Sequence, residues 1–207
     1  MFITLEGPDG SGKTSHMQPL AEWLEGLGWR VHTAREPGGT LISEQIRQVI
    51  HDLKNTDMHP HTETLLYQAA RAQIVEQVLR PKLADGWIVL CDRYADSTLA
   101  YQGYGHQQNM DEVRALVRYA TGGLLPDLTL LLDVDVEIGL MRSSQRHATG
   151  GEWNRLDAYQ MDFHRRVRAG YLELAKQEPW RWVLVDACQP QDLVLAALRA
   201  AILRRIQ

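Results

Sequence analysis

The sequence predicts an α/β domain in which helices cover both faces of a parallel sheet. Short apolar runs alternate with longer amphipathic stretches along the 207 residues. The apolar runs lack in–out alternation, which is typical of strands buried on both faces. Strands that alternate with helices in this way form parallel sheets. The chain contains no linker rich in Pro, Gly or Ser, so we expect a single domain over residues 1–207.

The expected strands and helices follow in chain order. The strands are expected over residues 2–6, 30–35, 87–92, 128–134 and 181–186. Helices are expected from the glycine-rich turn to about Leu24, over 62–79, over 158–175 and near the C-terminus. In the last helix, apolar residues three and four apart between Leu195 and Ile206 form one face, as in a helix packed on a core.

Composition and charge exclude several classes of protein. The hydrophobic content of 44% excludes overall disorder, and the net charge of −4 argues against nucleic-acid binding through overall charge. Cys91 and Cys188 fit no metal or disulfide framework. Residues 2–6 are expected to form a strand, so we expect no signal peptide, and no apolar run has membrane-spanning length. We therefore expect a cytoplasmic protein with no membrane or nucleic-acid partner.

The glycine-rich turn after the first strand matches a phosphate-binding motif. "GPDGSGKT" fits the pattern G-x-x-x-x-G-K-[ST] and lies between a strand and a helix, the context that the motif requires. Its glycines let backbone N–H groups point at phosphate oxygens. Lys13 is expected to reach the β- and γ-phosphates, and Thr14 to ligate Mg²⁺. The expected ATP-binding residues are Gly7, Pro8, Asp9, Gly10, Ser11, Gly12, Lys13 and Thr14.

The third expected strand ends in Asp92-Arg93, beside the cradle in a parallel sheet. A carboxylate there is suited to Mg²⁺ and its water, and an arginine to phosphate oxygens. Alone, the pair would equally fit a surface ion pair, but next to a phosphate cradle the functional interpretation is favoured. Residues 142–155 are polar, contain arginines and are interrupted by Gly150-Gly151, a pattern typical of a mobile loop.

Several motifs together resemble the bacterial thymidylate kinase family. They are "EGPDGSGKT" (6–14), "REPGGT" (35–40), "LLYQAARAQIVEQVLRP" (65–81), "DRYADSTLAYQG" (92–103), "PDLTLLLDV" (126–134) and the arginine-bearing loop. The resemblance covers nearly the whole chain. It implies a P-loop kinase fold with a five-stranded parallel sheet and a mobile lid over about residues 142–155. It also implies a homodimer that uses ATP and Mg²⁺ to phosphorylate dTMP in dTTP synthesis.

The resemblance implies a set of substrate-binding residues, namely Asp9, Glu36, Tyr67, Arg71, Arg93, Ser97, Thr98, Tyr101 and Gln102. In the family an acidic cradle residue contacts the sugar hydroxyl or water near it, an aromatic ring stacks on thymine, and an arginine four residues later reaches a thymine carbonyl. Asp9, Tyr67 and Arg71 match these positions, although the family ring is often Phe. Tyr101 resembles the ring that leaves no space for a 2′-hydroxyl. Glu36-Pro37 resembles a turn with a cis peptide bond.

The catalytic residues that the resemblance implies are Lys13, Arg93, Arg146 and Arg155. The acceptor is an ionised phosphate, so no strong general base is needed. Family members carry an extra arginine either in the cradle or on the lid. The cradle position here is Gly10, so we expect the lid arginines Arg146 and Arg155 to act. The family often has Asp before the last lid arginine, whereas this chain has Asn154.

Two alternatives remain open from the sequence. A deoxynucleoside kinase on the same scaffold would need a carboxylate base at the 5′-hydroxyl, and Glu36 is a candidate for it. A nucleotide-binding switch would need no base-stacking pocket, so Tyr67 and Arg71 argue against it.

Overall fold

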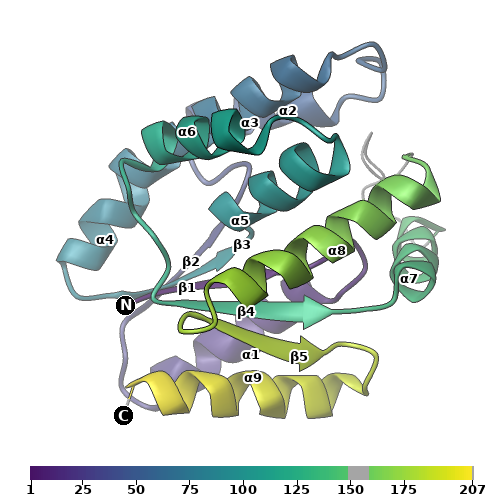
Figure 1. The fold of residues 1–207 in the computed structure, drawn as a ribbon. Helices are drawn as coiled ribbons and strands as arrows, with labels where there is room; N and C mark the ends of the chain where they lie inside the picture. Colours follow the sequence, from purple (N-terminus) through teal and green to yellow (C-terminus); the bar gives the residue numbers. More distant parts are fainter. Residues whose placement is uncertain (149–158, 207) are drawn as a thin grey trace.

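The computed structural model describes residues 1–148 and 159–206, except for the side chains of residues 146 and 147. Five parallel strands form one sheet in the order β2-β3-β1-β4-β5, as Figure 1 shows. The strands are β1 (Phe2–Glu6), β2 (Val31–Arg35), β3 (Ile88–Asp92), β4 (Leu128–Asp133) and β5 (Trp182–Asp186). Each of the expected strands is confirmed to within a residue or so. Because all strands run in one direction, their carboxyl ends share one edge of the sheet.

Helices connect the strands. They are α1 (Lys13–Gly26), α2 (Leu41–His51), α3 (Pro60–Ile74), α4 (Arg80–Ala84), α5 (Ala95–Thr98), α6 (Met110–Thr121), α7 (Val136–Ala148), α8 (Met161–Gln177) and α9 (Gln191–Ile206). Two π-helical segments, η1 (Val75–Leu79) and η2 (Leu99–Gly105), extend α3 and α5. No helix in the described ranges is long and apolar enough to cross a membrane.

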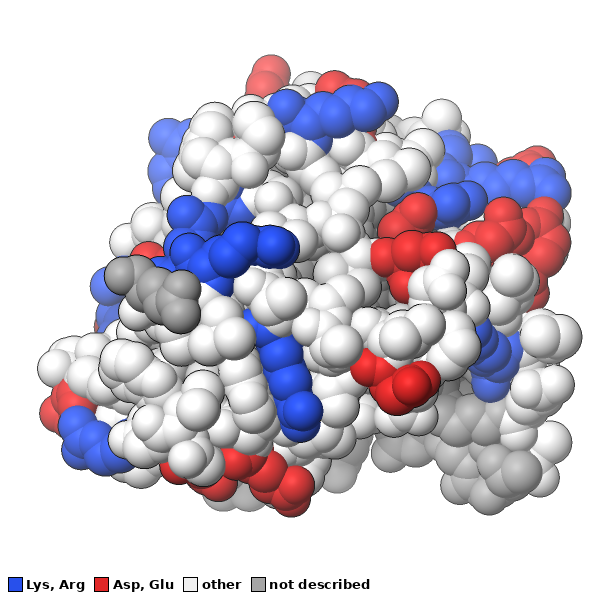
Figure 2. Space-filling model, turned by 90° about the horizontal axis from the view of Figure 1, so that it is seen from below, with Lys and Arg blue, Asp and Glu red and all other residues white. Residues whose placement is uncertain are grey.

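The core lies in two layers, one on each face of the sheet. Helices α1 and α9 cover one face, where Leu20 and Leu198 pack near the strand residues Leu5 and Leu130. Helices α3, α6 and α8, with η1 and η2, cover the other face (Figure 1). This double cover explains why the strands are apolar without alternation. Figure 2 views the molecule from the α9 side, where acidic and basic side chains are interspersed among uncharged ones.

The helix predictions need several corrections. The sequence analysis did not predict α6 or α7. The buried positions Val113, Val117 and Ala120 of α6 recur at helical spacing, so the pattern for this helix was present in the sequence. The predicted loop over 142–155 begins too early, because residues 142–148 continue α7. That stretch contains neither glycine nor proline, so nothing in it ends a helix. The helix expected over 158–175 is α8, which begins at Met161. Residues 149–155 of the predicted lid lie outside the described residues.

Candidate active site

The carboxyl ends of β1, β2 and β3 border a cavity of about 460 Å³. Its walls come from the glycine-rich turn, the segments after β2 and β3, and helices α2, α3, α5 and η2. All of the substrate-binding residues expected from the sequence line it, namely Asp9, Glu36, Tyr67, Arg71, Arg93, Ser97, Thr98, Tyr101 and Gln102. The cradle residues Gly10, Gly12, Lys13 and Thr14 line it too. One cavity therefore joins the phosphate cradle to an aromatic and polar wall on α3 and η2.

The glycines of the cradle are required by its backbone. Gly7, Gly10 and Gly12 all have positive φ values, of 145°, 72° and 88°. A Cβ at Gly10 would also collide with the backbone of Gly139 in α7. Any side chain at position 10, an arginine included, is therefore excluded unless α7 moves.

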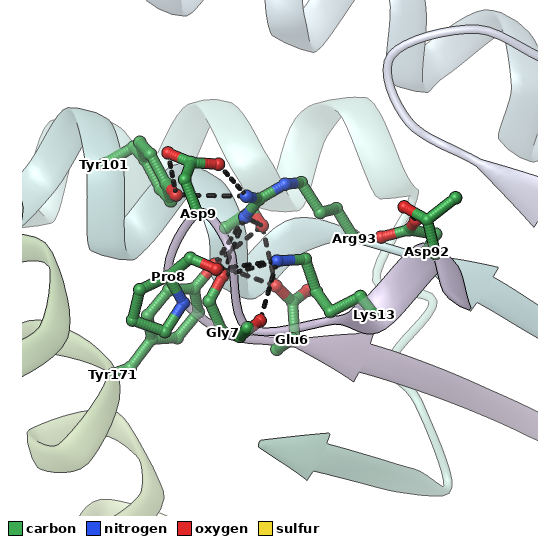
Figure 3. Close-up of polar contacts among 12 residues, drawn as sticks. Glu6, Gly7, Pro8, Asp9, Lys13, Asp92, Arg93, Tyr101 and Tyr171 are labelled. Atoms are coloured by element: carbon green, nitrogen blue, oxygen red, sulfur yellow. Dashed lines mark hydrogen bonds and ion pairs between the residues drawn. The ribbon is translucent and has the colours of Figure 1, made fainter. Parts of the chain in front are cut away.

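Lys13 lies inside the cradle with its ammonium group held by cradle oxygens. Nζ donates to the carbonyl oxygens of Gly7 and Pro8, both at 2.9 Å, and to Ser11 Oγ at 3.1 Å (Figure 3). Burial, and then the nearby Arg93 cation, lower the pKa of Lys13 to about 8. A bound anion would favour the charged lysine, so the site is suited to several negative charges.

Thr14 and Asp92 form a pair of oxygen ligands beside the cradle. The Thr14 hydroxyl donates to Asp92 Oδ2 at 2.6 Å, and both residues line the cavity. Hard oxygen ligands of this kind suit Mg²⁺. No group of three or more His, Cys, Asp or Glu side chains that could hold a metal occurs within residues 1–148 and 159–206.

Arg93 occupies the centre of the site. It has a left-handed backbone (φ 67°), an uncommon conformation for an arginine that turns the chain as β3 ends. Its Nη2 donates to Asp9 Oδ1 at 2.6 Å and to Tyr101 Oη at 3.0 Å, and Tyr101 Oη donates to Asp9 Oδ2 at 2.8 Å. Its Nη1 donates to the carbonyl of Gly7 at 3.0 Å. Burial alone would raise the pKa of Asp9, but Arg93 and then Lys13 hold it below its usual value.

The structure adds Glu6, a residue that the sequence analysis did not single out. Its side chain is fully buried behind Arg93 (Figure 3) and accepts hydrogen bonds from Tyr94 N–H at 2.8 Å, Ser97 Oγ at 2.6 Å and Tyr171 Oη at 3.0 Å. Ser97 and Tyr171 in turn accept from Arg93 Nη1, at 3.3 and 3.2 Å. Glu6 therefore orients two hydroxyl groups that hold the Arg93 guanidinium.

Arg71 is fixed in the cavity wall by a set of buried contacts. It is 2% exposed, and its Nε donates to Glu36 Oε2 at 2.7 Å. Its Nη1 donates to Thr98 Oγ1 at 2.8 Å and to Gln68 Oε1 at 3.0 Å, and its Nη2 donates to the Tyr94 carbonyl at 2.9 Å. Burial raises the pKa of Glu36, and Arg71 opposes this. The Glu36–Pro37 bond is cis.

Helix α2 contributes cavity residues that the sequence analysis missed. Arg47 and His51 line the cavity, as does Arg35 at the end of β2. Arg35 pairs with Glu44, and Arg47 donates to the Pro37 carbonyl at 3.1 Å. Arg47 and His51 are four residues apart and therefore share one helix face. This spacing is the only sign in the sequence that the two side chains act at one site.

The three arginines of the predicted lid differ in how far the structure describes them. Arg155 and the side chain of Arg146 lie outside the described residues. Arg142, at the start of the predicted lid, donates to the Ala187 carbonyl at 2.8 Å, on the segment after β5.

Comparisons with known proteins agree with this geometry. The chain matches the thymidylate kinase family over residues 5–198. It is 47% identical over 211 residues to a thymidylate kinase of Roseiflexus castenholzii, covering 98% of this chain and 92% of that protein. It is also 46% identical to a thymidylate kinase of Deinococcus radiodurans, covering 99% of this chain and 97% of that protein. The crystal structure of thymidylate kinase from Ehrlichia chaffeensis superposes with a TM-score of 0.78 at 32% identity, covering 98% of this chain and 97% of that one. The chain therefore belongs to the thymidylate kinase family.

Proposed function

We propose that this chain transfers the γ-phosphate of ATP to the phosphate of dTMP, giving dTDP and ADP for dTTP synthesis. Family membership supports the reaction. The observation that carries the proposal is the continuity of the cavity, which joins the cradle to a wall containing Tyr67, Arg71 and Gln102. A nucleoside monophosphate bound there has its phosphate at the cradle and its base against that wall.

At the phosphate end, the cradle of Gly7–Thr14 holds the ATP phosphates, with Lys13 at the β- and γ-phosphates. Arg93 contacts both the cradle carbonyl of Gly7 and Asp9, so it lies where donor and acceptor phosphates meet. A bidentate guanidinium stabilises charge that spreads over the migrating phosphoryl group. Thr14 and Asp92 would hold Mg²⁺, which when bound neutralises phosphate charge.

At the nucleoside end, Tyr67 stacks on the thymine ring and Arg71 donates to a thymine carbonyl. Arg71 Nη2 carries two hydrogens, of which the Tyr94 carbonyl takes one. Asp9 faces the sugar hydroxyls, and the buried Tyr101 ring lies where a 2′-hydroxyl would have to fit. Glu36, Ser97 and Thr98 support this wall through Arg71 and Arg93.

The lid supplies the remaining cation in this proposal, with Arg146 and Arg155 as the candidates. The backbone at Gly10 leaves no place for an arginine in the cradle, which favours this source. Expulsion of water by a closed lid would limit ATP hydrolysis.

One observation favours the alternative of a deoxynucleoside kinase. Glu36 Oε1 is buried without a hydrogen-bond partner in the described part of the chain, so a substrate hydroxyl that reached it would satisfy this acceptor. An assay of ADP formation separates the two functions. It supplies ATP and Mg²⁺ and compares five conditions, with dTMP, thymidine, dUMP, dCMP or no acceptor. We expect the highest kcat/KM with dTMP. Turnover of thymidine in place of dTMP would refute the proposal and assign Glu36 as the base.

A homodimer, as the resemblance implies, is the expected assembly. Leu41, Ile42 and Val49 of α2 and Leu65 of α3 are large apolar side chains that are 46–78% exposed. Paired helices of a second copy would cover them. Sedimentation at micromolar concentration tests this, and a monomer would contradict it. A cytoplasmic location stays a prediction.

A further inference from the structure

The amide of Gln102 has one defined orientation in the cavity wall. Gln102 is 2% exposed, lines the cavity, and donates from Nε2 to Glu63 Oε1 at 2.8 Å. Its Oε1 takes part in no hydrogen bond among the residues that the structure describes. An amide that donates on one side presents its carbonyl on the other. Because Gln102 lines the cavity, its Oε1 is an acceptor left for a ligand, beside the second hydrogen of Nε2.

Glu63 enforces this orientation. It is fully buried in the first turn of α3 and does not itself line the cavity. Gln102 Nε2 donates to Oε1, and Tyr159 Oη donates to Oε2 at 3.2 Å. His106 Nε2 lies 3.1 Å from Oε1, and the tautomer that carries a hydrogen at Nε2 donates to it. An ionised carboxylate only accepts hydrogen bonds. If the Gln102 amide turned over, its carbonyl oxygen would face a carboxylate oxygen with no hydrogen between them, which is strongly unfavourable in a buried site.

We propose that Glu63 is a positioning residue that selects the pyrimidine base by fixing Gln102 as a hydrogen-bond acceptor. This inference rests on the proposed function, in which the base lies against the wall containing Gln102. Thymine and uracil carry a hydrogen at N3, and Gln102 Oε1 accepts it. Cytosine has no hydrogen at N3 and presents a lone pair there, which opposes the Gln102 carbonyl. Glu63 thus excludes cytosine from a distance.

The test compares kcat/KM for dTMP, dUMP and dCMP in wild type and variants. Glu63→Met removes the acceptor while keeping side-chain length, so both amide orientations become available. We expect the dTMP/dCMP ratio to fall about tenfold or more, since rejection of a mismatched polar edge depends on a fixed partner. The dTMP/dUMP ratio should change less than about twofold, because uracil keeps the N3 hydrogen and the loss of a methyl group involves apolar contacts alone.

Three further variants distinguish positioning from general disturbance. Glu63→Gln offers a carbonyl in place of Oε1, so it should restore most of the dTMP/dCMP ratio. Glu63→Asp keeps the charge but withdraws it from Gln102, so it should lower the ratio and serves if Glu63→Met does not fold. In a Gln102→Met background, Glu63→Met should leave the ratio unchanged, because the residue through which it acts is gone.

An equal fall in kcat/KM for all three substrates would overturn the inference and make Glu63 a structural residue only. So would an additive loss in the double variant. If wild-type protein is active on dTMP and these ratios do not move, only the role of Glu63 fails. If wild-type protein shows no turnover of dTMP, the proposed function fails, and the inference with it.

Discussion

Replacing Glu6 by glutamine should make the stability difference from wild type depend on pH. The Glu6 carboxyl is fully buried, and burial first, then the nearby Asp96 carboxylate, raise its pKa from 4.5 to about 7. The native state therefore holds this proton more tightly than the unfolded chain does. Its contribution to stability is fully present below about pH 4.5 and is lost as the pH rises through about 7. The amide of Glu6→Gln does not titrate.

The magnitude follows from this interval. One pH unit corresponds to about 1.4 kcal/mol for each proton. Between pH 4.5 and about 7, the free energy of unfolding of wild type should therefore fall by up to about 3 kcal/mol relative to Glu6→Gln. A protonated Glu6 and the Glu6→Gln amide each place a hydrogen among the donors around this position, such as Ser97 Oγ, so the two proteins are compared like for like at acid pH. As the pH rises, wild type should lose stability relative to Glu6→Gln.

Urea unfolding followed by circular dichroism, at intervals from about pH 5 to pH 8, measures the difference. Titrating groups far from Glu6 are common to both proteins and cancel. Lys13 does not cancel fully, because the Glu6 carboxylate raises its pKa and Glu6→Gln removes that effect, so the comparison is sharpest below about pH 7. Glu76→Gln is the control, because the Glu76 side chain is 68% exposed and its pairing partner Arg80 is also partly exposed. Its stability difference from wild type should be small at every pH. A Glu6→Gln difference that stays constant from pH 5 to pH 8 would refute the assignment of a neutral, buried Glu6 at acid pH.

Three further predictions concern the cavity. Asp92→Asn should raise the Mg²⁺ concentration for half-maximal activity by roughly 10–100-fold, as a Mg²⁺ titration would reveal; an unchanged titration would remove Asp92 from the metal site. Tyr67→Ala should weaken dTMP binding by about 1–3 kcal/mol, the value of stacking on a base, whereas Tyr67→Phe should retain binding in calorimetry; equal losses would exclude stacking. Tyr101→Ala should accept the ribose form of TMP as a substrate, and Tyr101→Phe should not. The measurement is the ratio of kcat/KM for dTMP to kcat/KM for the ribose form. An equal ratio in both variants would show that the ring does not exclude the 2′-hydroxyl.

The parts of the site that the sequence could predict are those set by short-range rules. The cradle could be predicted because Gly7, Gly10 and Gly12 have backbone conformations that other residues rarely adopt. Asp92 and Arg93 could be placed beside it because parallel strands end at one edge of a sheet. Tyr67 and Arg71 are one helical turn apart, so a shared face follows from helix geometry. The substrate that these residues serve came from the resemblance to a family.

The parts that escaped prediction depend on contacts between distant segments. Arg47 and His51 line the cavity only because α2 packs on α3, and a charged helix face is usually exposed to solvent. Ser97 and Thr98 were expected at the substrate, but their hydroxyl groups are also bound to Glu6 and Arg71 within the wall. Such pairings follow from the folded sheet, and no spacing in the sequence encodes them.

Three buried glutamates explain much of what the sequence left out. Glu6 holds the groups around Arg93, Glu36 holds Arg71, and Glu63 holds Gln102. Each is at most 6% exposed, and a buried carboxylate is costly unless donors surround it. Three buried glutamates behind one cavity cost stability but fix the orientation of the side chains in its wall. A wall that is already rigid loses little conformational entropy when the nucleotide binds, which favours binding. A glutamate inside the apolar strand "FITLE" was the one visible sign of this arrangement, because nothing in a buried strand favours a charge except a partner that the sequence alone does not identify.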